Sequence, residues 1–212
     1  MRRIIRNVFI MFMAVVLCFT SEFCGARAEA LSVNAKALKA YKKLLAKNEK
    51  EPFCRFFALI DLNKDGVMEL VYGDDSRDPY HSSLLAYVNG KVKAVGGGFS
   101  GDEKYYPNKH LYYTSTFHTG VEEHSYYKFT GKKLVKLAEK YGNESINAVT
   151  GKPKTKKDKK KYKSLFAPYK YTVRGKTVSK KKYESYVKNL KKGAKNKKLK
   201  FVKNNVGNRN NM

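Results

Sequence analysis

Ten residues, numbers 61–70, constrain the fold of this chain more than any other segment, because they join an oxygen-rich loop to apolar flanks. Side-chain oxygens recur at every second position, and Gly66 stands where the chain must turn sharply, which glycine tolerates because it adopts φ > 0 easily. Ca²⁺ takes about six to eight oxygen ligands in proteins. The spacing therefore predicts a Ca²⁺ site whose ligands are Asp61, Asn63, Asp65, the backbone carbonyl of Val67, and Glu69.

The alternative interpretation of this segment is a metal-free turn, since Asp, Asn and Gly favour turns without any ligand. Three formal negative charges, on Asp61, Asp65 and Glu69, would then repel one another at short range. That repulsion favours a bound cation. The apolar runs at residues 56–60 and 70–72 are too short for helices, so we expect a strand on each side of the loop.

The spacing of the loop resembles the calcium loops of EF-hands, dockerins and the FG-GAP/VCBS repeats of integrin-like β-propellers. An EF-hand loop closes with a bidentate glutamate where this chain has Tyr72, and its flanks are helices. The strand-flanked form with Glu69 as the closing carboxylate is more similar to the FG-GAP/VCBS version. A propeller needs several blades and the chain has one such loop, so we do not expect a propeller.

The wider pattern of residues 36–140 resembles a group of small exported proteins of Gram-positive bacteria. Its parts are an amphipathic N-terminal segment, the run FALIDLNKDGVMELVYG, and a tyrosine-rich stretch of short strands. The resemblance implies a fold and a calcium loop, and it implies no reaction.

The first 28 residues have the pattern of a signal peptide. Arg2, Arg3 and Arg6 precede an apolar run of 12 residues, 8–19, which lies within the ~7–15 of a signal core and below the ~20 needed to span a bilayer. Residues 26–28, Ala-Arg-Ala, then provide a cleavage site, so we expect a mature chain that begins at Glu29 and is secreted, with no transmembrane segment. A retained membrane anchor is the alternative.

Cleavage at that site would remove Cys18 and Cys24 and leave Cys54 as the one thiol. A single cysteine cannot form an internal disulfide, so stability must come from an apolar core and from the metal. Cys54 stands in an apolar stretch, and we expect it to be a small buried core residue.

Positive charge is concentrated at the C-terminal end of the mature chain. Residues 29–150 carry a net charge of +3, whereas residues 151–212 carry 21 Lys, 2 Arg and 2 acids, a net charge of +21. Diffuse lysine charge favours long-range attraction to polyanions. We therefore expect association with anionic cell-wall polymers or an anionic membrane surface. Nucleic-acid binding is a further alternative, which the shortage of arginine and the predicted export disfavour.

These patterns predict an α+β protein with a domain at residues 29–150 and a partly ordered lysine-rich region at 151–212. Its core would be one antiparallel meander of six to eight strands, preceded by an amphipathic helix at 30–50. The strongest local signal is the hairpin of residues 84–88 and 91–95 across Asn89-Gly90. Further expected strands are 111–117, 125–129, 134–137, 169–173 and 199–202, with a helix after Ser179 that runs to about residue 192. We expect a flexible glycine-rich loop at 96–101, a lysine-rich linker at 151–163, and a frayed end at 204–212.

One other cluster of the sequence has residues that catalyse proton transfer. His118 and His124 flank Glu122 and Glu123, so a secreted hydrolase with its site near the two histidines is the second hypothesis for function. No nucleophile motif accompanies them. The leading hypothesis is a non-enzymatic, calcium-binding protein of the cell envelope.

Overall fold

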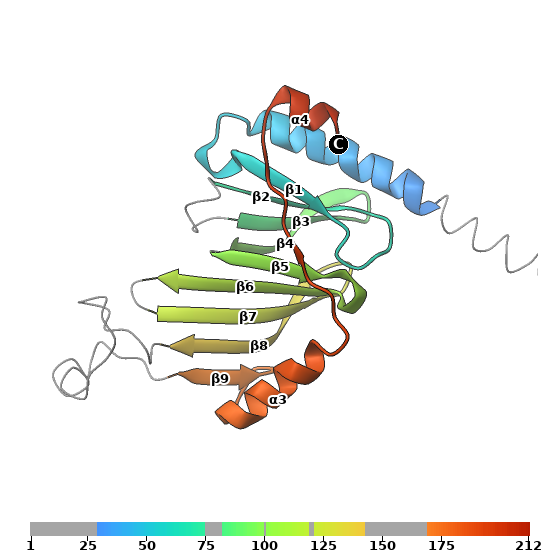
Figure 1. The fold of residues 1–212 in the computed structure, drawn as a ribbon. Helices are drawn as coiled ribbons and strands as arrows, with labels where there is room; N and C mark the ends of the chain where they lie inside the picture. The colour runs from blue at the N-terminus through green and yellow to red at the C-terminus, as the bar shows by residue number, and fades with distance from the viewer. Residues whose placement is uncertain (1–28, 75–81, 100, 119–120, 143–168) are drawn as a thin grey trace, which may run out of the picture.

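The computed structural model describes residues 29–74, 82–99, 101–118, 121–142 and 169–212. The predicted signal peptide and the predicted linker at 151–163 lie outside these ranges. The described chain is a mixed α+β structure dominated by antiparallel strands, with few helices (Figure 1). None of the helices in the described ranges is long and apolar enough to cross a membrane.

The strands form two antiparallel sheets, where the sequence predicted one meander of six to eight strands. The first sheet contains, in spatial order, β12 (Val202–Lys203), β1 (Phe56–Ile60), β2 (Glu69–Gly73), β3 (Ser82–Val88) and β4 (Lys91–Phe99). The second contains β10 (Lys176–Thr177), β9 (Lys170–Val173), β8 (Leu134–Gly142), β7 (Val121–Phe129), β6 (Leu111–His118), β5 (Asp102–Tyr106) and β11 (Lys197–Lys198). The prediction missed β5, β10 and β11 because these segments are polar and lack an apolar alternation.

Residues 96–99 belong to β4, so the prediction of a flexible loop was wrong for this part of the segment 96–101. Gly96 pairs with Leu84 of β3. A Cβ atom at Gly96 would lie 2.6 Å from Leu134 Cδ1 and 2.7 Å from the ring of Phe99. The absence of a side chain at Gly96 leaves room for the side chains of Leu134 and Phe99, which is a packing reason for glycine inside a strand.

Each sheet carries a helix on its outer face. The helix of residues 29–47 lies on the five-stranded sheet, and its Ala37, Tyr41 and Leu45 are fully buried against Phe57 and Leu70. Helix α3 (Lys180–Leu190) lies on the seven-stranded sheet (Figure 1). Ser179 caps α3 by accepting a hydrogen bond from the Lys182 N–H.

The inner faces of the two sheets share one apolar core. Its buried members are Ile60, Leu62, Val71, Leu84, Ala86, Val88, Phe99, Tyr112 and Phe129. Residues of the two sheets meet at Phe99 and Tyr112, whose ring centroids lie 5.4 Å apart. Burial of these side chains is the main source of cohesion between the sheets.

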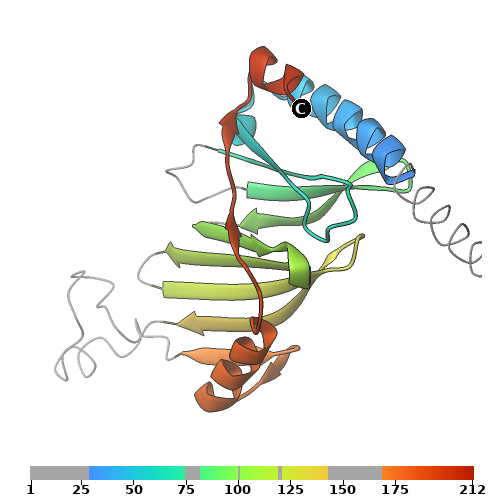
Figure 2. The same ribbon diagram turned by 45° about the vertical axis from the view of Figure 1, so that its right-hand side comes forward.

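Residues 191–212, which we name the C-terminal strap, cross both sheets and end beside the N-terminal helix (Figures 1 and 2). The strap adds β11 to the edge at β5 and β12 to the edge at β1, and between these strands Leu199 and Phe201 pack against the shared core. Its last turn is α4 (Val206–Asn210).

The predicted fraying of residues 204–212 was therefore wrong. Asn204 is buried, and its amide donates hydrogen bonds to the backbone carbonyls of Leu45 (3.0 Å) and Cys54 (2.9 Å). Arg209 donates to Asn204 Oδ1 at 2.8 Å and forms an ion pair with Glu49 at 2.9 Å. These contacts join the end of the chain to residues about 150 positions earlier, and no local pattern could have indicated them.

Candidate metal-binding loop

The acidic loop connects β1 to β2, with a strand on each side as the sequence predicted. Two residues give it its sharp turn: Lys64 at φ 59° and Gly66 at φ 82°. A left-handed conformation is costly for lysine and easy for glycine. Strand pairing between Ile60 and Glu69 closes the base of the loop.

Four hydrogen bonds within the loop hold its side chains. Asp61 Oδ2 accepts from the Gly66 N–H at 3.2 Å, and Asp65 Oδ1 accepts from the Val67 N–H at 2.8 Å. Asp65 Oδ2 accepts from the Asn63 amide at 2.6 Å. Glu69 Oε2 accepts from the N–H of Leu62 at 2.8 Å. Three backbone N–H groups of the loop thus donate hydrogen bonds to its own carboxylates.

Two side-chain oxygens of the loop lack any such partner. Asp61 Oδ1 and Asn63 Oδ1 are buried and form no hydrogen bond. Within the described parts of the chain, no lysine, arginine or histidine forms an ion pair with Asp61, Asp65 or Glu69. An unpaired buried acceptor costs free energy. These two oxygens would therefore be stabilised by a positively charged partner.

Burial also acts on the carboxylates themselves. Glu69 is only 3% exposed, and burial, reinforced by the negative charges of Asp65 and Asp61, raises its pKa to about 8. Burial also raises the pKa of Asp61, and Asp65 adds to this effect. The environment therefore disfavours the ionised carboxylates in the absence of a cation.

The N-terminal helix holds the loop from one side. Asn34 Oδ1 accepts a hydrogen bond from the Met68 N–H at 2.9 Å, and the Tyr41 hydroxyl donates to the Met68 carbonyl at 3.1 Å. The N–H and the carbonyl of Met68 are thus both hydrogen-bonded to side chains of the helix. Sequence analysis missed Asn34 and Tyr41, since the spacing of the loop says nothing of a helix that lies 27 to 34 residues away.

The donor chemistry of the loop suits a hard cation such as Ca²⁺: carboxylate and amide oxygens, with the Val67 carbonyl beside them. Its carboxylates do not converge by themselves. Among the described residues, no group of three or more His, Cys, Asp or Glu side chains is arranged to hold a metal. Asp65, which is exposed, directs both oxygens to hydrogen bonds within the loop, so metal binding would require Asp65 and Asn63 to turn.

The second predicted cluster is only partly described. His124 lies on β7, where its Nδ1 is 2.7 Å from the Tyr113 hydroxyl and its Nε2 is 3.6 Å from Glu122 Oε2. Burial lowers the pKa of His124, with Lys140 as the next cause. The side chain of His118 lies outside the described part. In the β6–β7 ladder, His118 pairs with Val121 and His124 with Ser115, so the two histidines occupy separate positions of the ladder.

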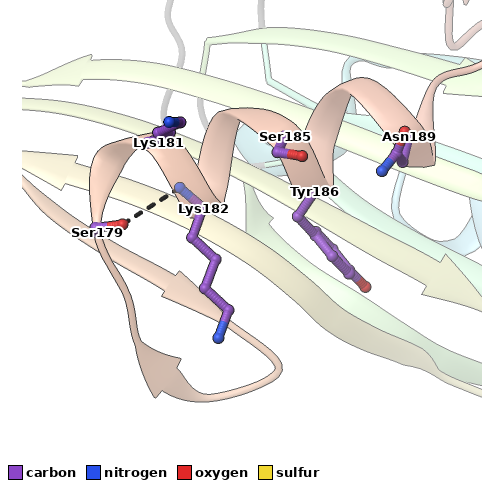
Figure 3. Close-up of a pocket in the computed structure, with 6 residues that line it drawn as sticks. All are labelled: Ser179, Lys181, Lys182, Ser185, Tyr186 and Asn189. Atoms are coloured by element: carbon purple, nitrogen blue, oxygen red, sulfur yellow. Dashed lines mark hydrogen bonds between the residues drawn. The ribbon is translucent and has the colours of Figure 1, made fainter.

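A shallow depression also lies on the outer surface of α3. It is lined by Ser179, Lys181, Lys182, Ser185, Tyr186 and Asn189. Figure 3 shows that Lys182 and Tyr186 extend to one side of the helix and that Lys181 points away from them. The side chains do not converge on a common point, so we treat the depression as part of the basic surface.

Comparisons of the chain with protein-family models, with curated proteins and with solved structures found no match.

Proposed function

We propose that this chain is an exported calcium-binding protein of the cell envelope and that it has no catalytic role. The observation that carries the proposal is the pair of buried, unpartnered oxygens in the loop, Asp61 Oδ1 and Asn63 Oδ1, beside a Glu69 side chain that is 3% exposed. Each of these groups would gain a partner from one bound cation. The predicted signal peptide supports the location of the protein.

Asp61, Asn63, Asp65, the Val67 carbonyl and Glu69 would hold the ion. When bound, Ca²⁺ supplies positive charge that offsets the burial of Glu69 and the mutual repulsion of the carboxylates. The chain's own contribution is to position these oxygens: β1 and β2 hold Asp61 and Glu69, and Asn34 and Tyr41 hold the backbone between them. Mg²⁺ fits less well because it demands a smaller and nearly octahedral set of ligands.

The role of the ion in this proposal is structural. The loop touches the N-terminal helix, and the helix covers one face of the five-stranded sheet, so an ordered loop stabilises a large part of the fold. Ligand at about 100 times its dissociation constant would contribute about 2.7 kcal/mol to stability.

The partner in this proposal is an anionic polymer of the envelope. Residues 169–212 carry 13 Lys and 2 Arg against a single acid, Glu184. Most of these lysines are exposed along α3 and the strap. Such a surface attracts polyanions over about 8 Å at physiological ionic strength, and salt screens that attraction.

Calorimetric titration of residues 29–212 with Ca²⁺ tests the proposal, because this chain contains every residue that the structure describes. We expect saturable binding of one Ca²⁺ and a higher melting temperature in excess Ca²⁺ than in EDTA. Asp61→Asn and Asp65→Ala should weaken both effects, whereas Glu51→Gln, an exposed acid outside the loop, should change neither. Equal melting temperatures of the unchanged protein in Ca²⁺ and EDTA would refute the metal site.

A further inference from the structure

The outer face of the seven-stranded sheet carries a line of aromatic and basic side chains that the sequence did not indicate. We name it the tyrosine–lysine row. It consists of Lys104 on β5, Tyr113 on β6, His124 on β7, Lys140 on β8, and Tyr169 just before β9. In the register, Lys104 pairs with Tyr113 and His124 pairs with Lys140. Tyr113 and His124 stand two positions apart in the β6–β7 ladder and are joined by a 2.7 Å contact between the Tyr113 hydroxyl and His124 Nδ1. Five adjacent strands span about 19 Å, the length of several sugar rings.

Helix α3 covers only part of this face. Its Tyr183 and Val187 bury Tyr126, Ala138 and Tyr171 of the sheet. Tyr113 and Tyr169 of the row pack against this cluster, and each of the five members of the row is only partly buried. The row is therefore partly open to solvent, whereas Tyr126, Ala138 and Tyr171 are buried under the helix.

Lysine ammonium groups lie over the tyrosine rings of this face. Lys140 Nζ is 4.0 Å from the centroid of the Tyr169 ring, and Lys104 Nζ is 5.8 Å from that of Tyr113. Lys191 of the strap lies 5.7 Å above Tyr126, whose ring is 4.8 Å from that of Tyr113. A ligand at this face would therefore meet positive charge and aromatic ring atoms together.

Hydrogen bonds hold the side chains of the row in place. The Tyr169 hydroxyl donates to Glu122 Oε2 at 2.7 Å, and Lys140 donates to the same oxygen at 3.2 Å. The Tyr113 hydroxyl is 2.7 Å from His124 Nδ1. Side chains that are already ordered lose little conformational entropy when a ligand binds, which favours affinity.

We propose that the tyrosine–lysine row binds an anionic polysaccharide, with sugar rings packed on Tyr113 and Tyr169 and acidic groups paired with Lys104, Lys140 and Lys191. This inference deepens the proposed association with envelope polymers and rests on it. Beyond general charge attraction, it assigns a defined site where the sugar rings of the polymer contribute to affinity.

Glu122 and Asp102 favour a ligand that carries hydroxyl groups. Both belong to this face of the sheet, since Asp102 pairs with Ser115 and Glu122 stands two residues before His124. Carboxylates accept hydrogen bonds from hydroxyl groups, which a polysaccharide carries on its rings. Arginine, which suits phosphate and base recognition, is absent from the row.

Two polymers of equal charge density separate the contribution of the rings from that of the charge. The probes are dextran sulfate, which has sugar rings, and poly(vinyl sulfate), which has none, each titrated against residues 29–212 in buffer with Ca²⁺. We expect Tyr169→Ala and Tyr113→Leu to weaken dextran sulfate binding at least tenfold and poly(vinyl sulfate) binding less than twofold. Tyr141→Ala is the matched control, because Tyr141 is an exposed tyrosine of β8 next to Lys140 that points to the opposite face.

Lysine variants test the charged part of the row. Lys104→Gln should weaken dextran sulfate binding more than Lys93→Gln, an exposed lysine of β4 on the other sheet. Melting curves of each variant identify loss of fold, and Tyr169→Phe, which keeps the ring, should restore dextran sulfate binding to within threefold of the unchanged chain.

The outcomes distinguish the two proposals. If both polymers bind and the row variants match their controls, the row is refuted and diffuse charge attraction stands. If neither polymer binds at low salt, the row and the proposed association with envelope polymers both fail, and the proposed Ca²⁺ site is unaffected. If single-stranded poly(dT) binds more tightly than dextran sulfate and through the same tyrosines, the ligand class is wrong and the row is a nucleic-acid surface.

Discussion

Asn34 of the N-terminal helix accepts a 2.9 Å hydrogen bond from the backbone N–H of Met68, which is the last residue of the acidic loop before β2 and is 34 residues away in sequence. Tyr41 of the same helix donates to the carbonyl of Met68. Two hydrogen bonds therefore connect the loop to the helix. A change in the loop reaches the helix through Met68.

The first prediction concerns this contact. Asn34→Ala removes the acceptor for the partly buried Met68 N–H and should cost about 1 kcal/mol of unfolding free energy, the usual net value of one hydrogen bond. If the loop binds Ca²⁺, the variant should also bind it more weakly. Urea unfolding in EDTA and in excess Ca²⁺ measures both effects. Lys39→Ala, an exposed position of the same helix, is the control, and equal midpoints for the two variants would contradict the prediction.

The second prediction concerns the end of the strap. Asn204→Ala removes hydrogen bonds to the carbonyls of Leu45 and Cys54 and leaves the buried Arg209 without its Asn204 acceptor. Several unsatisfied buried groups should lower the unfolding free energy by about 2–4 kcal/mol. Denaturant midpoints measure the loss. Asn210→Ala, an exposed asparagine six residues later, should cost less than about 0.5 kcal/mol, and a similar loss there would contradict the role of Asn204.

The third prediction concerns pH. Glu103 lies on the inner side of β5 and forms a short hydrogen bond with Ser82, and burial raises its pKa to about 7 from 4.5. The Tyr112 hydroxyl, fully buried and without a hydrogen bond of good geometry, lies near enough for each group to affect the other's pKa. Between pH 4.5 and 7, the folded state holds more protons at Glu103 than the unfolded state, so stability falls as pH rises through this window.

Glu103→Gln should remove this loss, because the amide stays neutral at every pH. At pH 8 the variant should be more stable than the unchanged chain by roughly 3 kcal/mol, the value that a pKa of about 7 instead of 4.5 gives at 1.36 kcal/mol per pKa unit, and at pH 4 the two should be nearly equal. Urea unfolding across pH 4–8 gives the difference. Glu69 is present in both proteins, so its own titration cancels. A stability difference that is constant with pH would count against the prediction.

The fourth prediction compares two glycines. Gly101 precedes β5 at φ 84°, and a Cβ atom there would overlap the carbonyl oxygen of Ser115. Gly131 has φ 81° and open space around the same position. Both alanine variants meet the left-handed strain of about 1–2 kcal/mol, and Gly101→Ala alone adds a backbone clash. Gly101→Ala should therefore lose at least about 2 kcal/mol more than Gly131→Ala in denaturant unfolding. Equal losses would show that the β4–β5 connection relaxes freely.

Local sequence patterns were enough for most of the individual elements. Strand β1 has the predicted bounds, and the Asn89-Gly90 hairpin joins β3 to β4 with both residues at positive φ. Ser179 caps α3, which ends two residues earlier than expected. In each case the signal lies within a few residues, because apolar periodicity, turn chemistry and capping are short-range effects.

The sequence by itself determined the mixed α+β class, the strand-flanked acidic loop and the concentration of lysine toward the C-terminus. Only the tertiary structure decided that the strands divide into two sheets, that β5 exists, and that the lysine-rich end is a strap built into both sheets. Only it brought Asn34 to Met68, paired Lys104 with Tyr113 and His124 with Lys140, and brought Tyr113 into contact with His124. The physical reason is that strand register and buried polar contacts join segments up to about 160 residues apart. Their partners are chosen by packing of the whole chain, which local periodicity does not encode.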